Sequence, residues 1–342
     1  MTRIRTALVG SYTQPEWLID RDALRQRLPA RVIKGDLWRV AAPYLDEAMD
    51  DAVLSVIHDQ EEAGIDIVTD GEVRRESYSA PFANALEGVA RDRVATRVGR
   101  AGKPNEVPLV IGPLSRPDPV HVEDVRFLRA HTHRTIKVTI PGPFTLSQLA
   151  VSEYYETPEA LAEAYADCLN AEIRDLFAAG ADIVQLDEPY LQARVEDAER
   201  YGVRVVNRAL AEVEGTTALH VCFGYAAIVG DKSAHGYSCL PLLAATIVDQ
   251  ISIEAAQPVL DLGPALQSLA DKTVMVGVID LGDERPETPD EVAVRLRAAL
   301  EHLPPERLIA APDCGMKYLS RASARAKLRA LAEGAAIVNE EL

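Results

Sequence analysis

The stretch Leu219-His220-Val221-Cys222-Phe223-Gly224 is rich in residues that favour β-strands. In a strand, residues two apart point to the same side, so the imidazole of His220 and the thiol of Cys222 would face one volume. Imidazole and thiolate are two of the ligands that proteins offer to zinc. An isolated His-x-Cys pair is more often accidental than metal-binding, so its meaning depends on the rest of the chain.

Similar short apolar segments recur along the whole chain and alternate with helical patterns. Strands are predicted at 6–11, 65–69, 136–140, 183–186, 218–223, 250–253, 274–279 and 308–311. Helices are predicted at 46–63, 158–179, 195–213, 289–301 and 321–337, with a shorter helix at 78–86, a hairpin within 88–112 and a helix before His131. Eight strands alternating with helices indicate an α/β fold, the (β/α)8 TIM barrel.

The same pattern sets the domain organisation. Insertions are expected after strands 1 and 2, at 13–45 and 73–135, within one domain that spans 1–342. The alternative is a doubly wound open sheet, but no Gly-x-Gly-x-x-Gly follows the first strand.

Charge and composition limit the classes of partner that this protein can bind. The 342 residues carry a net charge of −17, which argues against nucleic acid and anionic membranes as partners. No apolar run approaches the length of a membrane span, and the first residues run directly into a predicted strand without a signal peptide. Four cysteines are too few for a disulfide scaffold. We therefore expect a cytoplasmic protein with reduced thiols.

Polar residues gather where the predicted strands end. They are Ser11, Asp70, Glu72, Asp187, Glu188, His220, Cys222, Glu254, Asp280, Asp313 and Cys314. Barrel enzymes place their chemistry at the carboxyl ends of the strands, so this distribution favours the barrel and an active site at its mouth. A single carboxylate at a strand end is, however, about as often a cap for the next helix as a ligand group.

Two further segments complete the metal pattern. Glu254 ends the strand-like run 251–253, and Pro-Asp-Cys-Gly at 312–315 ends the last one. With the His-x-Cys pair, these residues resemble the catalytic half of cobalamin-independent methionine synthase, in a single-barrel "core" form, over nearly the whole chain. The resemblance implies Zn²⁺ held by His220, Cys222, Glu254 and Cys314. Cys168 is interpreted as a buried small hydrophobe and Cys239 as a spectator thiol in a loop.

The resemblance also implies how a substrate is held. Gly10 and Ser11 match the family turn that binds an amino-acid carboxylate, and Glu72 and Asp187 match the acids that hold the ammonium group. Catalytic roles follow for Glu72, Asp187 and Asp280. The implied substrate is homocysteine or a similar thiol, activated as a zinc-bound thiolate that attacks a methyl donor.

The residues with which the family binds and protonates its folate methyl donor are largely missing from this sequence. Gly282 stands where the family has a general-acid histidine, Leu149 where a tryptophan stacks on the pterin, and Ala193 where an acid binds it. The family's N-terminal barrel has no counterpart in this sequence. We therefore expect a methyl donor other than free methyltetrahydrofolate, such as a corrinoid or a corrinoid protein.

Two other functions remain open. An epoxyalkane:coenzyme M transferase is similar in its His-x-Cys and downstream cysteine, and would need cations for a sulfonate, for which Arg74 and Arg75 are candidates. A zinc barrel that binds a thiol without catalysis is the second alternative.

Overall fold

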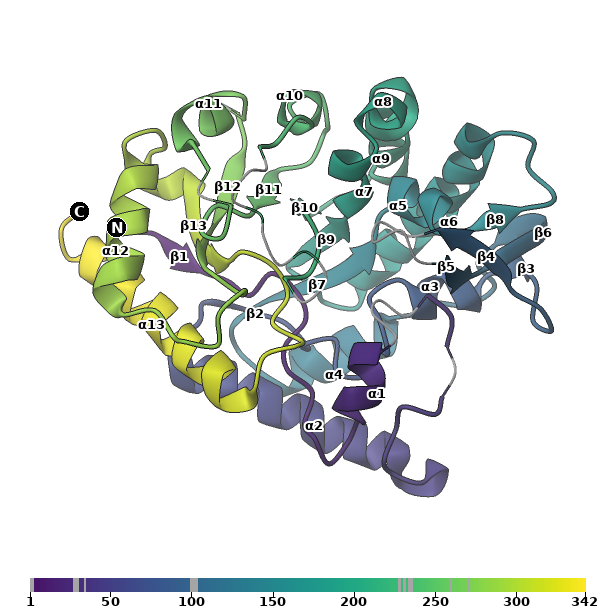
Figure 1. The fold of residues 1–342 in the computed structure, drawn as a ribbon, viewed down its shortest axis with the longest axis horizontal. Helices are drawn as coiled ribbons and strands as arrows, with labels where there is room; N and C mark the ends of the chain where they lie inside the picture. The colour runs from purple at the N-terminus through teal and green to yellow at the C-terminus, as the bar shows by residue number, and fades with distance from the viewer. Residues whose placement is uncertain are drawn as a thin grey trace.

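The chain folds into a barrel of parallel strands surrounded by helices (Figure 1). The computed structural model describes residues 3–26, 31–33, 35–98, 104–226, 229, 232, 236–258, 260–269 and 271–342. The barrel strands are β1 (Arg5–Thr6), β2 (Ile67–Val68), β7 (Thr135–Pro141), β9 (Ile183–Asp187), β10 (Thr216–Val221), β11 (Gln250–Ile253), β12 (Thr273–Ile279) and β13 (Leu308–Pro312). Their order in the sheet is β1-β13-β12-β11-β10-β9-β7-β2.

A parallel bridge between Ala7 and Ile67, with a 3.3 Å hydrogen bond from Leu8 N to Ile67 O, joins the two edges of this sheet. The predicted TIM barrel is confirmed. The eight strands also lie where the sequence predicts them, except that β1 and β2 are only two residues long.

The strands are buried on both faces, as parallel sheets require. The inner residues of the barrel form their own apolar cluster, separate from the larger layer under the helices: Ala7, Val9, Ile67, Ile183, Ala218, Met275, Ile309 and Ala311. The core therefore leaves the carboxyl ends of the strands as the place for polar side chains.

The long helices pack outside the barrel. They are α2 (Ala42–Ala63), α4 (Val122–His131), α6 (Pro158–Ala178), α12 (Pro289–Leu300) and α13 (Arg321–Asn339). Their ends follow from the sequence: Gly64 closes α2 in a left-handed conformation with φ 87°, and Thr288 with Glu291 forms a capping box on α12. The first described residues lie beside the end of the last helix, where Ile4 N donates to Asn339 Oδ1 at 2.7 Å.

The helix predicted at 195–213 is present over 195–209, but it contains a π-turn that the sequence did not predict. That segment contains α8 (Val195–Asp197), a π-helical turn η1 (Ala198–Gly202) and α9 (Val203–Ala209). Gly202 packs so closely that a Cβ there would lie 2.6 Å from Leu191 Cδ2. A π-turn changes the direction in which the following side chains point, and periodicity alone does not reveal it.

The insertions form smaller structures on the barrel. After β2, α3 (Ala80–Ala85) is followed by a hairpin of β4 (Ala95–Val98) and β5 (Pro104–Val107), and by a sheet of β3 (Glu87–Val89), β6 (Leu109–Ser115) and β8 (Val151–Ser152). The hairpin predicted within 88–112 is thus confirmed, although 99–103 lie outside the described residues. The insertion at 13–45 carries α1 (Arg21–Gln26) and an Ile19–Trp38 bridge, with 27–30 and 34 outside the description.

The remaining elements are short. They are α5 (Pro143–Gln148), α7 (Pro189–Ala193), α10 (Leu240–Leu243), α11 (Leu262–Gln267) and the 3₁₀ turn η2 (Pro305–Arg307). Among the described residues, none of the helices combines the length and apolarity needed to cross a membrane.

Candidate metal and substrate site

Three predicted metal ligands meet at the carboxyl end of the barrel. His220 lies on β10, Cys222 follows that strand directly, and Cys314 follows β13. One ligand atom from each lies within 4.8 Å of the other two, and all three residues are buried. Two thiols and an imidazole at this spacing are a donor set that suits zinc.

The imidazole of His220 is oriented for a ligand. Its Nδ1 lies 3.0 Å from Ser252 Oγ on the neighbouring strand β11, where Ser252 is its register partner. Its Nε2 is buried and has no hydrogen-bond partner among the described residues. Metal-binding histidines commonly have one ring nitrogen fixed by a hydrogen bond while the other coordinates the ion. The geometry of His220 fits that pattern.

The electrostatics of the thiols fit a cation as well. The hydrogen bond with Cys222 and burial raise the pKa of Cys314 well above its ordinary value, and nearby Glu254 adds to the effect. Two thiolates this close are unfavourable without a positive charge between them. A divalent metal ion supplies that charge, so the side chains present fit a zinc ion.

Glu254, the fourth predicted ligand, ends β11 beside this group. Its Oε1 accepts a 2.6 Å hydrogen bond from Lys232 Nζ, and its Oε2 accepts one of 3.2 Å from Phe223 N. Both Lys232 and Glu254 are fully buried, so they form an internal ion pair next to the cysteines. The three-residue group within 4.8 Å does not include Glu254.

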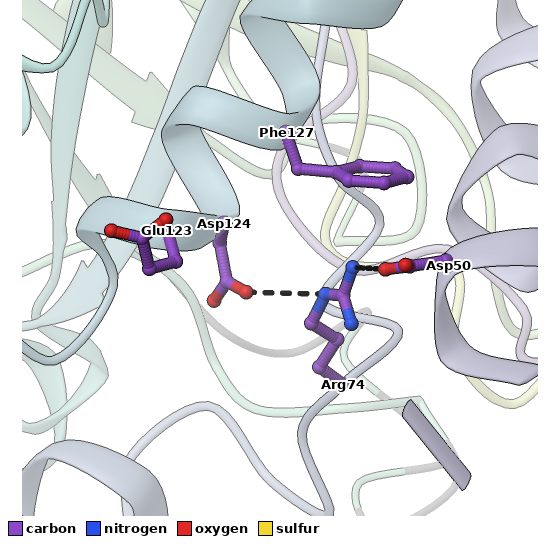
Figure 2. Close-up of a pocket in the computed structure, with 5 residues that line it drawn as sticks. All are labelled: Asp50, Arg74, Glu123, Asp124 and Phe127. Atoms are coloured by element: carbon purple, nitrogen blue, oxygen red, sulfur yellow. Dashed lines mark hydrogen bonds and ion pairs between the residues drawn. The ribbon is translucent and has the colours of Figure 1, made fainter. Parts of the chain in front are cut away.

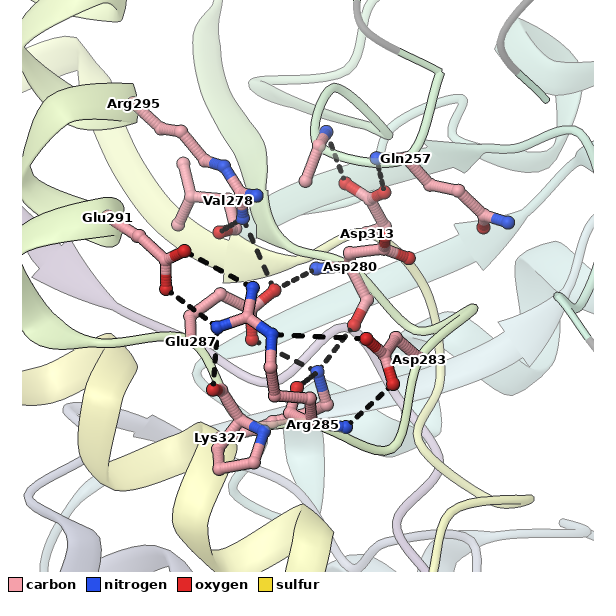
Figure 3. A network of polar contacts seen from close by, with 12 residues as sticks. Gln257, Val278, Asp280, Asp283, Arg285, Glu287, Glu291, Arg295, Asp313 and Lys327 are labelled. Carbon is pink, nitrogen blue, oxygen red and sulfur yellow. Dashed lines mark hydrogen bonds and ion pairs between the residues drawn. The ribbon is translucent and has the colours of Figure 1, made fainter. Parts of the chain in front are cut away.

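Asp313 braces the loop that carries this acid. Its carboxylate accepts hydrogen bonds from the backbone of Ala255, Ala256 and Gln257 at 3.0, 2.9 and 2.7 Å. Figure 3 shows Gln257 beside Asp313. The residue before Cys314 thereby ties the end of β13 to the turn after β11. Asp313 is a structural acid, which the sequence alone did not distinguish from the ligand-binding acids.

The other two cysteines lie outside the metal group. Burial raises the pKa of Cys168 to about 11 and that of Cys239 to about 12. A buried thiol with a raised pKa is inert. This agrees with Cys168 as a buried small hydrophobe and with Cys239 as a spectator thiol.

The predicted substrate residues supply polar atoms that the protein leaves without partners. Ser11 Oγ and Glu72 Oε2 are buried and make no hydrogen bond with any described residue. Buried polar atoms are nearly always paired, so such atoms indicate a place for a ligand or ordered water. Glu72 Oε1, in contrast, accepts a 2.9 Å hydrogen bond from Thr139 Oγ1, which fixes the carboxylate.

The backbone around these two residues is shaped for close approach. Glu72 has φ 54°, in the left-handed region that a non-glycine residue seldom adopts. A Cβ on Gly10 would lie 2.7 Å from Glu72 Oε1, and a Cβ on Gly315 would lie 2.2 Å from Ser11 Oγ. Strained backbone of this kind clusters at functional sites. Glycine at 10 and 315 lets Ser11 and Glu72 reach the mouth.

Asp187, the second predicted ammonium-binding acid, ends β9 next to the metal strand. It is the register partner of His220, and burial raises its pKa to about 7. Its Oδ1 accepts a 2.8 Å hydrogen bond from Gln185 Nε2. The next residue, Glu188, has a structural role, because its carboxylate accepts hydrogen bonds from Phe144 N and Thr145 N at the start of α5.

Asp280 directly follows β12 at the same end of the barrel, but its side chain and backbone N–H form hydrogen bonds within the turn after that strand. Its Oδ1 accepts a 2.7 Å hydrogen bond from Gly282 N, while its backbone N–H donates to Glu287 Oε1 at 2.7 Å (Figure 3). Lys327 Nζ donates to Asp280 O at 2.8 Å and to Glu287 Oε2 at 3.0 Å. The structure places Asp280 in a capping network. Its predicted catalytic role stays a prediction.

Arg74 and Arg75, the candidate sulfonate ligands, already have acidic partners. Arg74 extends into an outer pocket of about 400 Å³ that Asp50, Glu123, Asp124 and Phe127 also line (Figure 2). There it pairs with Asp50 and, at 3.3 Å, with Asp124. Arg75 is buried, lies 3.5 Å from Asp70 Oδ2, and donates to Thr139 O at 2.6 Å.

Three buried basic residues escaped sequence reasoning. Lys137 is a lysine in an apolar strand, which is an anomaly that the sequence shows. Arg31, from the insertion at 13–45, is buried over the Tyr78 ring at 5.3 Å and donates to Ser79 Oγ at 3.2 Å. No short-range pattern in the sequence marks Arg31 or Lys232.

Comparisons with known proteins identify the family of this chain. Residues 4–336 match the family described as cobalamin-independent synthase, catalytic domain. The methionine synthase of Saccharolobus solfataricus is 34% identical over 342 residues, covering 98% of this chain and 95% of the relative. That of Sulfolobus acidocaldarius is 35% identical over 349 residues, covering 100% and 94%.

A solved structure agrees in fold and sequence. The B12-independent methionine synthase from Shewanella sp. W3-18-1, in complex with selenomethionine, superposes with a TM-score of 0.90 at 34% identity and covers 99% of this chain and 98% of that one. A Listeria monocytogenes structure with a TM-score of 0.71 shares only 20% identity and supports the fold alone. By the match over residues 4–336 and by these relatives, the chain belongs to the catalytic-domain family of cobalamin-independent methionine synthases and is a methyltransferase enzyme.

Proposed function

We propose that this protein is a zinc-dependent thiol S-methyltransferase that methylates homocysteine. The observation that carries the proposal is the convergence of His220, Cys222 and Cys314 within 4.8 Å, at the end of the barrel that also holds Ser11 and Glu72 with unpartnered buried atoms. Zinc bound there would hold a substrate thiol as the thiolate near neutral pH, although free thiols have a pKa of about 8.5. Glu254 remains our proposed fourth ligand.

The residues around the metal ligands would bind and orient the amino-acid part of the substrate. Glu72 and Asp187 offer two carboxylates to an ammonium group, and Ser11 Oγ offers a hydrogen bond to a carboxylate. All three side chains are at most 9% exposed, so water is largely excluded from these contacts. Charged hydrogen bonds are strongest in such settings. The same burial would shield a thiolate before it attacks.

The relatives support this substrate. The Saccharolobus and Sulfolobus proteins are named methionine synthases, and the Shewanella structure contains selenomethionine, the selenium analogue of the methylated product. We carry the substrate over to this chain as a proposal. We also propose that residues 1–342 form one domain and that the protein is cytoplasmic.

We further propose that the methyl donor is not free methyltetrahydrofolate. Leu149 is buried in the core, Ala193 has no acid to offer, and a Cβ at Gly282 would lie 2.7 Å from Gln257 Nε2. General acid catalysis contributes about 10²–10⁴-fold, and methyltetrahydrofolate needs it because its leaving nitrogen must be protonated. A donor with a better leaving group, such as a methylated corrinoid, avoids that requirement.

The experiment compares donors on the zinc-loaded enzyme. Methyl transfer to homocysteine is measured with methylcobalamin and with methyltetrahydrofolate at equal concentration. Faster transfer from methylcobalamin supports the donor assignment, and efficient turnover with the folate alone overturns it. No transfer from any donor, with homocysteine bound, would favour the thiol-binding barrel. The coenzyme M alternative has less support, because Arg74 and Arg75 are both paired with acids.

A further inference from the structure

A lysine lies inside the barrel beneath the substrate residues. Lys137, on β7, is fully buried, and its Nζ donates to Gln185 Oε1 at 2.7 Å. The same nitrogen lies 3.5 Å from Met275 Sδ. Met275 belongs to β12, which is not a neighbour of β7 in the sheet, so the amine must cross the interior of the barrel. A buried ammonium group is costly unless it serves a purpose or is well paired.

The contact with Gln185 fixes the orientation of an amide. Because Lys137 donates to Gln185 Oε1, the other end of that amide, Nε2, faces Asp187 and donates to its Oδ1 at 2.8 Å. Burial lowers the pKa of Lys137 to about 7, and its charged form has only donors, so that form is compatible with only one of the two amide orientations. The relay therefore runs from the Lys137 amine, through the oriented amide of Gln185, to Asp187.

The direction of the relay matters for Asp187. An amide N–H facing the carboxylate stabilises its charged form, whereas an amide oxygen in the same place would repel it. Without Lys137 both orientations of Gln185 would fit the same volume. The relay uses one oxygen of Asp187 and holds the carboxylate in place for a ligand.

We propose that Lys137 is a positioning residue for amino-acid recognition, which orients Gln185 so that Asp187 is presented as a carboxylate to the substrate's ammonium group. The inference rests on the proposed function, in which Asp187 binds that ammonium. It assigns Lys137 and Gln185 to selectivity for aminothiols over simple thiols. A lysine that merely fills the barrel would instead affect all thiols alike.

Two ligands that differ only in the amino group separate these roles. Homocysteine and 4-mercaptobutyrate share the thiol, the chain and the carboxylate, but only homocysteine has the ammonium. Dissociation constants of both are measured with the zinc-loaded wild type, Lys137→Met and Gln185→Leu. We expect each variant to bind homocysteine about tenfold more weakly or worse, as for loss of one charged hydrogen bond, and 4-mercaptobutyrate within about twofold of wild type.

A double variant tests whether the two residues act as one relay. Lys137→Met/Gln185→Leu should weaken homocysteine no more than the stronger of the single changes, because residues in one network are not additive. Equal weakening of both ligands, no weakening of either, or additive losses would each overturn the relay. If Lys137→Met does not fold, Gln185→Leu carries the ligand comparison by itself.

Asp187→Asn separates this inference from the function on which it depends. If Asp187→Asn loses homocysteine selectively while Lys137→Met and Gln185→Leu do not, the relay is wrong and the proposed substrate site stands. If Asp187→Asn weakens homocysteine and 4-mercaptobutyrate equally, the ammonium site itself is wrong, and the relay with it.

Discussion

Two regions of the barrel mouth differ in how their buried polar groups are satisfied. Around the metal ligands, His220 Nε2, Ser11 Oγ and Glu72 Oε2 are buried without a partner among the described residues. In the turn after β12, Asp280 and Glu287 bind the backbone and the side chains of their own network (Figure 3). Buried polar atoms without a partner are uncommon, so several of them together support a ligand site, whereas hydrogen-bonded groups stabilise the protein. The comparison supports our proposal that the first region binds ligand, and the contacts of the second are structural.

The largest effect should come from the first region. Cys222→Ser or Cys314→Ser should lower zinc affinity by more than about 100-fold, since changes even to second-shell partners cost 10–100-fold. Metal content per chain, measured on the purified proteins, checks this. Cys168→Ser is the matched control, because Cys168 is buried in α6, and it should keep full zinc. Full zinc in both serine variants would remove the metal site from this region.

The next effect concerns Asp187. Asp187→Asn should weaken homocysteine by about 1.5–3 kcal/mol, the value of a charged hydrogen bond, and change 4-mercaptobutyrate much less. Burial raises the pKa of Asp187 to about 7, so the acid gains its charge as the pH rises through that value. The preference of wild type for homocysteine should therefore grow with pH across this range, and Asp187→Asn should lose that part of the dependence.

A smaller effect is expected for Asp280. Asparagine keeps the oxygen that accepts from Gly282 N, so Asp280→Asn should preserve the turn and keep kcat/KM within a few-fold of wild type. A group that transfers a proton in the reaction would instead cost about 10²–10⁴-fold. A loss of that size would move Asp280 from the structural region into the catalytic one.

The smallest effect should come from Arg74, in the outer pocket of Figure 2. Its partners Asp50 and Asp124 lie on outer helices, so Arg74→Gln should leave kcat/KM for homocysteine unchanged within about twofold. If a sulfonated thiol were the substrate, this variant would show a raised KM for it. Kinetics with both thiols on wild type and Arg74→Gln decide the matter.

The sequence predicts the barrel well because the signals are local. Eight apolar runs and the glycine and capping residues between them specify strands and helix ends without reference to distant contacts. The metal group was also predictable, because its residues end apolar strands and such ends converge in a barrel. The π-turn at 198–202 was not, because hydrophobic periodicity does not distinguish it from an ordinary helical turn.

Roles of individual acids depend on contacts that no linear pattern encodes. Asp187 and Asp313 both follow apolar strands, yet one faces the mouth and the other binds three backbone N–H groups. The Lys137–Gln185 contact joins two strands 48 positions apart and becomes visible only in the closed barrel. The sequence predicted which polar residues lie at the strand ends. Only the hydrogen bonds in the structure distinguish the structural acids among them from those free to bind a ligand.

The join between β1 and β2 connects the two segments that carry Ser11 and Glu72. Each of these strands has two residues, and a single bridge at Ala7–Ile67 closes the barrel between them. Hydrogen bonds beyond the strands reinforce this join, from Thr6 N to Asp66 Oδ2 at 2.9 Å, from Thr69 Oγ1 to Gly10 O at 2.7 Å and from Tyr12 N to Gly71 O at 2.9 Å. The segment that carries Ser11 and the one that carries Glu72 are therefore tied to each other on both sides of the shortest strands. A substrate that binds both residues would find them already held at a fixed spacing.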